Sequence, residues 1–153
     1  MCSSDLGKLA LTDSVSKFIP AFREMRVVSR GASGSEFTPA RRAITIRDLL
    51  THRSGLTYGF LDNGLVGDAY RSGGVSDGLG LTEGDLTQNM ERLARIPLVS
   101  QPGAEWHYSL GIDVLGRVIE VVSGMPLDAF FRDRIFGPLK MTDRKSTRLN
   151  SSH

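Results

Sequence analysis

The sequence predicts a mainly α-helical chain with long loops and little β-structure. Apolar residues recur at helical spacing over residues 45–51, 83–95 and 109–123, and each of these segments has a recognisable capping residue or stop signal. Residues 56–80 are rich in glycine and show no sustained period, which indicates a long loop. Only residues 26–28 have the composition of a strand.

The N-terminal part is predicted to be irregular. Residues 7–20 combine a short apolar segment with a brief helical turn at 15–19, which Pro20 closes. Residues 26–28 favour a short strand. Residues 31–39 are rich in Gly and Ser, so we expect an exposed loop there.

A short helix is predicted next, over residues 45–51. Thr45 is a suitable N-cap, and Asp48 at the third helical position completes a Thr-x-x-Asp capping pattern. Gly55 ends this element. We expect residues 56–80 to follow as a long, functional loop.

Two longer amphipathic helices follow. Residues 82–85 cap a helix over 83–95, in which Leu86, Met90 and Leu93 share one face and which Pro97 ends. Residues 109–123 carry the strongest helical pattern, and Gly124 supplies the stop. The predicted buried stripe of this helix is Ile112, Leu115, Val118, Ile119 and Val122.

The last predicted helix covers residues 126–135. Pro126 suits its first position, and the Gly137-Pro138 pair is a stop signal. Residues 132–134 should form a solvated face with a local ion pair. The side chains expected to be buried are Phe130, Phe131 and Ile135.

Composition excludes several classes of function. The chain has 153 residues, 40% of them hydrophobic and 24% charged, which is typical of one globular domain with a real core. No apolar run approaches the ~20 residues of a membrane span, and no basic stripe alternates with aromatic residues, so we expect neither a membrane span nor nucleic-acid binding. Cys2 is the single cysteine, so no internal disulfide can form. The compartment stays open between bacterial cytoplasm and periplasm.

The two ends differ in character from the rest of the chain. Residues 1–6 and 145–153 are polar and without period, and they resemble translated adapter or cloning sequence. We therefore expect the native domain to cover residues 7–144.

Two motifs relate the chain to a known family. Residues 101–111 read QPGAEWHYSLG, and residues 45–56 read TIRDLLTHRSGL. Together they resemble the penicillin-recognising serine hydrolases, which include class C β-lactamases, DD-peptidases and the β-lactamase-like family VIII carboxylesterases. The resemblance implies an α+β fold of the β-lactamase/transpeptidase type, of which residues 7–144 would be a partial, helical region.

The resemblance also implies a mechanism and gives Tyr108 a catalytic role. In this family the serine of a Ser-x-x-Lys motif attacks an ester or amide carbonyl, while the lysine and a tyrosine manage its proton. The pKa of a phenol is ~10, so neighbouring cations must lower the pKa of such a tyrosine. Tyr108 matches the tyrosine position. The structural alternative is a half-buried packing residue.

The nucleophilic serine and its lysine are expected outside this chain. The parent protein would then form and hydrolyse an acyl-serine, while the 153 residues alone would be inactive. Leu110 stands where the β-lactamase pattern has an Asn that contacts the substrate amide. Because Leu cannot make that hydrogen bond, the sequence favours ester hydrolysis over lactam hydrolysis.

Two serines match nucleophile motifs formally, but neither has the right context. Ser14 and Lys17 satisfy Ser-x-x-Lys, yet residues 7–20 resemble the family's segment just after the nucleophile helix. Ser76 lies in a Gly-x-Ser-x-Gly sequence at 74–78, which lacks the preceding strand and following helix of a nucleophile elbow. We expect neither to be the nucleophile.

The remaining candidates are interpreted as structural. His52 and His107 invite a catalytic triad with Ser54 or Ser109, but we expect His52 to stabilise a turn and His107 to be a loop side chain near the cleft. Trp106 is expected to be a packing anchor beneath the Tyr108 turn. The three histidines lack metal-ligand spacing, so neither a metal nor a cofactor is expected.

The predicted function is therefore a carboxylesterase-like serine hydrolase acting on a small-molecule ester or amide. A β-lactamase or DD-peptidase is one alternative. Others are a non-enzymatic penicillin-binding-type receptor and a small helical interaction module. The oligomeric state stays open.

Overall fold

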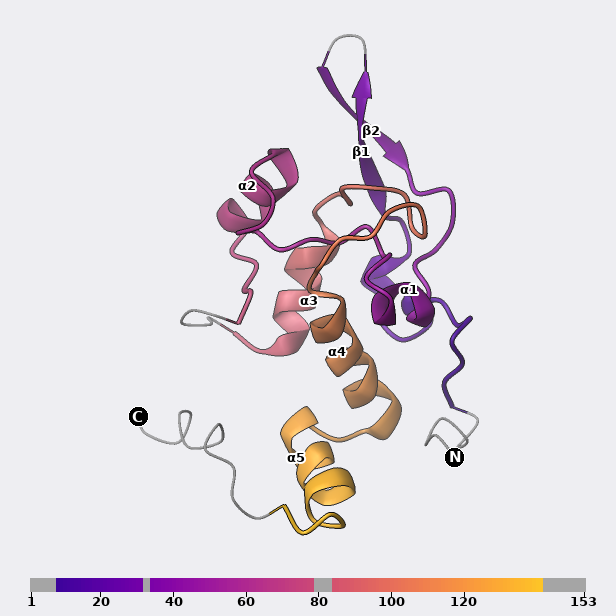
Figure 1. Cartoon of the computed structure of the whole chain (residues 1–153), viewed down its shortest axis with the longest axis vertical. Helices are drawn as coiled ribbons and strands as arrows, with labels where there is room; N and C mark the ends of the chain where they lie inside the picture. Colours follow the sequence, from indigo (N-terminus) through magenta and orange to yellow (C-terminus); the bar gives the residue numbers. More distant parts are fainter. Residues whose placement is uncertain (1–7, 32–33, 79–83, 142–153) are drawn as a thin grey trace.

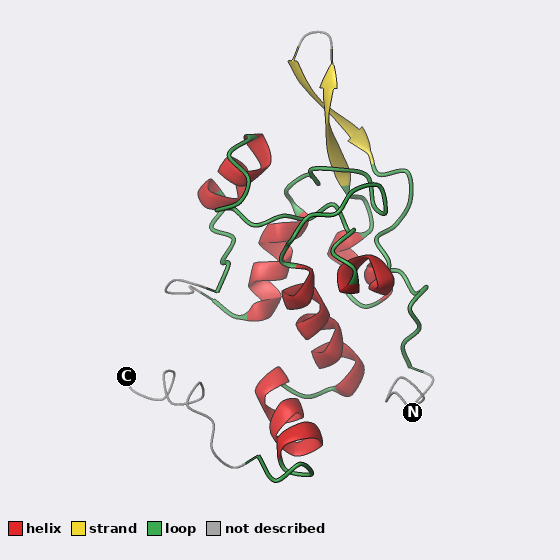
Figure 2. Ribbon diagram, viewed as in Figure 1, coloured by secondary structure: helices red, strands yellow, loops and turns green. Residues whose placement is uncertain are grey.

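The computed structural model describes residues 8–31, 34–78 and 84–141. The two ends predicted to be non-native, residues 1–6 and 145–153, lie outside this described part. Helices α1, α3 and α4 gather at the centre, a β-hairpin projects beyond them, and α5 lies at the opposite end (Figures 1 and 2). The described part is thus mainly helical with long connections, as the sequence predicts.

The N-terminal segment forms two 3₁₀ turns and a hairpin. The turns are η2 (Val15–Lys17) and η3 (Pro20–Phe22), so Pro20 opens a second turn after the predicted one. Strand β1 (Arg26–Gly31) pairs antiparallel with β2 (Gly34–Pro39).

The prediction of a loop over residues 31–39 was therefore wrong for β2. Almost every residue of β2 is exposed, so the strand has no buried face and no apolar alternation in its sequence. Backbone pairing with β1 holds it instead. The predicted strand at residues 26–28 is confirmed, and it continues further than expected.

Helix α1 (Ile46–Leu50) forms where it was predicted, with Thr45 as its N-cap. The next helix, α2 (Leu65–Ser72), lies inside the segment that was predicted to be a loop. The sequence does not predict α2, because glycines, which favour loops, stand at its N-cap (Gly64) and in its first turn (Gly67). A Cβ on Gly67 would come within 1.8 Å of the Asp62 carbonyl oxygen, so a glycine is required there.

Three helical segments complete the fold. Helix α3 (Leu86–Ala94) begins at the N-cap Asp85, whose carboxylate accepts the Gln88 N–H, while the predicted start at residue 83 lies outside the described residues. Helix α4 (Gly111–Ser123) ends at Gly124 in the left-handed conformation, as predicted. Helix α5 (Leu127–Phe131) continues into a π-helical turn, η4 (Arg132–Phe136), where Arg132 and Asp133 form the expected local ion pair.

The buried face of α4 differs from the predicted stripe. Val118 is fully buried as predicted, but its fully buried companions are Leu110 and Val114. Ile112 is 52% exposed, and the other predicted positions, Leu115, Ile119 and Val122, are only partly buried. The buried row runs at i, i+4 spacing along the side of α4 that packs on α1 and α3. The apolar periodicity predicted the helix correctly, but the face it predicted to be buried is rotated by about a quarter-turn from the face that is buried in the structure.

The C-terminal helices are less buried than predicted. Phe130, Phe131 and Ile135 are only half-buried. Phe131 packs on its neighbours Phe130 and Phe136 instead of entering the main core. The main core lies between η2, η3, α1, α2, α3 and α4, and its largest fully buried side chains are Tyr70, Phe22, Ile44, Ile46, Leu49, Leu56, Met90, Leu93, Leu98 and Leu110.

Candidate active site

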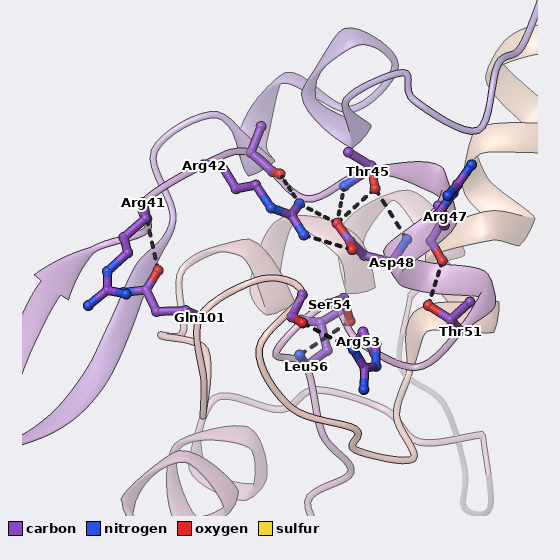
Figure 3. Close-up of polar contacts among 12 residues, drawn as sticks. Arg41, Arg42, Thr45, Arg47, Asp48, Thr51, Arg53, Ser54, Leu56 and Gln101 are labelled. Atoms are coloured by element: carbon purple, nitrogen blue, oxygen red, sulfur yellow. Dashed lines mark hydrogen bonds and ion pairs between the residues drawn. The ribbon is translucent and has the colours of Figure 1, made fainter.

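The site is built on the start of α1, where a capping box is joined to an arginine. Thr45 Oγ1 accepts the Asp48 N–H at 3.2 Å, and the Asp48 carboxylate accepts the Thr45 N–H at 2.9 Å. Arg42 binds the same carboxylate through both terminal nitrogens, at 2.6 and 2.9 Å (Figure 3). This arrangement fixes the direction in which α1 leaves the preceding segment.

The charge of Asp48 is retained despite its burial. Burial alone pushes the pKa of this carboxyl upward. The hydrogen bonds from Arg42 and Thr45 outweigh that effect, and the pKa lies below its ordinary value. Asp48 is therefore a charged, fully bonded anchor under α1.

A tight corner follows α1 at residues 52 and 53. His52 has φ +54°, a left-handed conformation that is uncommon for a residue with a side chain. Two N–H groups of the loop before α4 bind this corner: Gly103 N–H donates to the Arg53 carbonyl at 2.7 Å, and His107 N–H donates to the His52 carbonyl at 2.8 Å. The corner therefore holds the loop that leads to Tyr108.

Tyr108 lies at the junction between this loop and α4. Ser109 and Leu110, which follow it, are fully buried, so the backbone is anchored directly after the tyrosine. The Tyr108 side chain itself is 50% exposed. The phenol is thus open to solvent on a backbone that is buried directly after it.

Aromatic rings form a row on both sides of Tyr108. The Tyr108 ring centroid lies 4.9 Å from that of His52 and 5.3 Å from that of Tyr58. Tyr58 stacks on Phe60 at 5.0 Å, and His52 meets Trp106 edge-on at 6.0 Å. The row joins residues from three separate parts of the sequence and presents a partly exposed apolar surface beside the Tyr108 hydroxyl.

Two acidic residues influence this row electrostatically: Asp113 of α4 and Asp77 of the connection between α2 and α3. Burial raises the pKa of Tyr58, and the charges of Asp113, Tyr108 and Asp77 raise it further. Burial also raises the pKa of Asp113, with Asp77 adding to the effect. The phenol of Tyr58 is thus kept neutral and able to donate a hydrogen bond. Sequence reasoning missed this residue because a tyrosine in a glycine-rich loop carries no spacing signal.

The formal nucleophile motifs are not assembled. Lys17 forms an ion pair with Asp13 at 3.1 Å, and Ser14 Oγ bonds Ser16 Oγ at 3.0 Å. Ser76 lies in a connection between α2 and α3, where its backbone exchanges two hydrogen bonds with the Asn89 side chain. Ser14 stands before a 3₁₀ turn of only three residues, and Ser76 lies between two helices instead of between a strand and a helix, so neither has the setting of its motif.

The predictions for the two histidines and for Trp106 differ in how they compare with the structure. His107 Nε2 lies 3.1 Å from a Glu105 carboxylate oxygen. Ser54 Oγ accepts the Leu56 N–H (Figure 3). His52 Nδ1 lies 3.5 Å from Ser109 Oγ, so this part of the triad pairing exists as a long hydrogen bond. Trp106 is 61% exposed, so its prediction as a packing anchor was wrong: its indole contacts the His52 ring at the surface.

Within the described ranges, no three His, Cys, Asp or Glu side chains gather as metal ligands. No helix of the part of the chain that the structure describes is long and apolar enough to cross a membrane. The titratable side chains that the structure places around Tyr108 are the Tyr58 phenol, the His52 imidazole and the Asp113 carboxylate.

Comparison with known proteins identifies the family. The family model described as Beta-lactamase matches residues 4–151. The chain belongs to the Beta-lactamase family. The resemblance drawn from the two motifs is thereby confirmed, together with the β-lactamase/transpeptidase-like fold class, of which this chain contains a mainly helical part.

Among curated relatives, esterase EstB from Burkholderia gladioli is 43% identical over 137 residues, which are 90% of this chain and 32% of that protein. Lovastatin esterase from Penicillium rubens is 35% identical over 145 residues, covering 93% of this chain and 34% of its own length. The chain spans about a third of the length of the curated relatives it matches.

Solved structures give the same result. EstCE1, described as a hydrolase with promiscuous acyltransferase activity, superposes with a TM-score of 0.73 at 39% identity, over 90% of this chain and 33% of that one. Simvastatin synthase (LovD) from Aspergillus terreus, as the LovD6 mutant, superposes with a TM-score of 0.67 at 31% identity, over 92% and 31% of the two chains. The chain is therefore similar to esterases and acyltransferases of the β-lactamase fold.

Proposed function

We propose that this chain is part of a carboxylesterase-like serine hydrolase in which Tyr108 accepts the proton of the nucleophile. The observation that carries the proposal is the Tyr108 side chain, half-exposed at a junction whose next two residues are fully buried. Tyr108, as a phenolate stabilised by the lysine that the rest of the enzyme would supply, would take the proton of a serine hydroxyl as the serine oxygen attacks the ester carbonyl. Tyr108 would return that proton to the departing alcohol, which leaves an acyl-serine for water to hydrolyse.

An ester is a better fit than a β-lactam. The Leu110 side chain lies in the core and its N–H bonds the Thr57 carbonyl at 3.4 Å, so this position offers a substrate no polar side chain. The relatives named as esterases support the same choice. An alcohol that replaces water as acceptor gives acyl transfer, the activity named for EstCE1 beside its hydrolysis.

We further propose that residues 7–144 are a native segment of a longer enzyme that supplies the nucleophilic serine and its lysine. The share of the relatives that the chain spans, about a third, supports this. The 153-residue chain should then hydrolyse p-nitrophenyl acetate no faster than buffer does. Genomic sequence on either side of residues 7 and 144 should show a Ser-x-x-Lys motif upstream; without it a non-enzymatic receptor would be the better assignment.

A chimera tests the role of Tyr108. Residues 8–141 replace the matching third of esterase EstB, and hydrolysis of a p-nitrophenyl ester and of nitrocefin is measured. We expect ester hydrolysis to exceed nitrocefin hydrolysis, and Tyr108→Phe to lower kcat by about 10²- to 10⁴-fold, the usual contribution of a general base. A faster nitrocefin reaction would reverse the choice of substrate.

Tyr70→Phe is the matched control. Tyr70 is fully buried, and its hydroxyl accepts the Thr57 N–H at 3.5 Å, so its loss should lower stability and leave kcat unchanged. If Tyr108→Phe keeps the kcat of the parent chimera, Tyr108 is not the proton acceptor.

A further inference from the structure

The corner after α1, residues 52 and 53, contacts the loop that leads to Tyr108 both through its backbone and through a side chain. At the backbone, residues 52 and 53 accept the N–H groups of His107 and Gly103. At the side chain, the His52 ring lies between the rings of Trp106 and Tyr108. The same residue therefore orients both the peptide that precedes Tyr108 and the phenol itself.

The His52 ring is itself held in place. Its Nδ1 lies 3.5 Å from Ser109 Oγ, and Ser109 is fully buried. Ser109 Oγ also accepts the Gly111 N–H at 3.4 Å, which leaves the hydroxyl proton free to point at Nδ1. The bond between Nδ1 and Ser109 Oγ joins the His52 ring to the fully buried residue that follows Tyr108.

The backbone of the corner has an independent anchor. The left-handed conformation of His52 is strained for a residue with a Cβ, and such conformations persist only where surrounding contacts hold them. Here the contacts are the α1 C-terminus, where the His52 and Arg53 N–H groups bind the Leu49 and Asp48 carbonyls at 3.2 and 2.7 Å. Asp48 is also the residue that Arg42 anchors, so the corner is tied to the capping box.

From these contacts we propose that His52 is the positioning residue of Tyr108, which it holds against the reacting groups by ring contact and by the Ser109 bond. The inference rests on the proposed function, since it assigns the residue that orients the proposed proton acceptor. His52 touches no reacting atom in this scheme, so it is not a catalytic residue. Its loss should lower kcat far more than it changes KM, because a misplaced proton acceptor slows the chemical step without altering substrate affinity.

The first test uses the EstB chimera with two variants. His52→Ala removes the ring, and His52→Asn removes the ring but keeps a side chain that tolerates the left-handed backbone. We expect both to lower kcat by about 10- to 100-fold with KM changed less than about threefold. The control is His107→Ala, which removes a histidine ring of the loop before α4 that bonds Glu105 and keeps the backbone N–H bond to His52; this variant should keep its kcat. A folded His52→Asn variant with an unchanged kcat overturns the inference.

A double-mutant cycle separates this inference from the proposed function. If His52 acts through Tyr108, then His52→Asn should cause no further loss of kcat in a Tyr108→Phe background. An equal loss in both backgrounds overturns the positioning role while Tyr108 keeps its own. An unchanged kcat in Tyr108→Phe alone overturns the proposed function instead.

A second readout needs no activity. Trp106 is the sole tryptophan of the chain, and its indole meets the His52 ring. In the 153-residue chain, His52→Asn should shift the emission of Trp106 and lower its anisotropy as the loop loses its ring contact, whereas Ser72→Ala on α2 should change neither. Identical emission and anisotropy in His52→Asn would show that His52 does not hold this loop.

Discussion

Replacing Asp48 by Asn tests whether the anchor under α1 supports the fold as its geometry implies. The change keeps the size of the side chain but removes its charge. The amide can offer one oxygen where the carboxylate accepts from Arg42 and Thr45 with two. The ion pair with Arg42 is therefore lost and the capping box is weakened.

The size of the expected stability loss follows from how exposed the Asp48 and Arg42 side chains are. A weakened N-cap interaction costs about 1 kcal/mol. A charge-assisted pair between groups at this depth is worth roughly 1–2 kcal/mol, because Asp48 is buried but the Arg42 side chain is 45% exposed and partly screened. We expect a loss of about 2–3 kcal/mol in the free energy of unfolding, or about 5–10 °C in Tm for a chain of this length.

Urea unfolding of the 153-residue chain, followed by circular dichroism, measures this loss. The matched control is Asp68→Asn, since Asp68 pairs with Arg71 on an exposed face of α2, and its loss should cost less than about 1 kcal/mol. Equal unfolding midpoints for Asp48→Asn and the unsubstituted chain would refute the reasoning.

The same anchor predicts a pH dependence with a definite sign. Folding lowers the pKa of Asp48, so its contribution is complete above the ordinary value of 3.8 and is lost as the pH falls through the lower folded value. The difference in stability between the chain and Asp48→Asn should therefore shrink in that acid range. A difference that stays constant would mean that the carboxylate charge is not responsible.

The remaining predictions concern stability, each measured by urea unfolding of the 153-residue chain. Gly55→Ala should cost more than about 2 kcal/mol, because φ is +82° and the new Cβ would lie 2.2 Å from a backbone oxygen; a neutral result would show that the corner can relax. Leu110→Ala should cost about 2–5 kcal/mol and Ile112→Ala less than about 1 kcal/mol. The reverse order would mean that the buried face of α4 is the one predicted from periodicity. Asp113→Asn should stabilise the chain at neutral pH, since burial raises the pKa of this carboxyl and so penalises its charged form on folding; the gain should vanish in acid, where the carboxyl is protonated in both states.

Tertiary contact accounts for the features that the sequence pattern missed. Strand β2 is exposed along most of its length and is held by pairing with β1, so no alternation of apolar residues could reveal it. Helix α2 contains Gly67 because the Asp62 backbone comes too close for any side chain, and that glycine resembles a loop signal in the sequence. In both cases a neighbouring segment decides the local structure against the pattern of the local sequence.

The sequence alone determined the features that depend on residues close together in the chain. The capping box of Thr45 and Asp48 joins groups three residues apart, and the Gly124 stop and the Tyr108 junction likewise lie within one turn of α4, so short-range spacing suffices to place them. Only the tertiary structure decided which face of α4 is buried and which rings surround Tyr108. His52 and Ser109 are 57 residues apart in the chain, and their approach depends on the packing of α1 against α4, which no local periodicity contains.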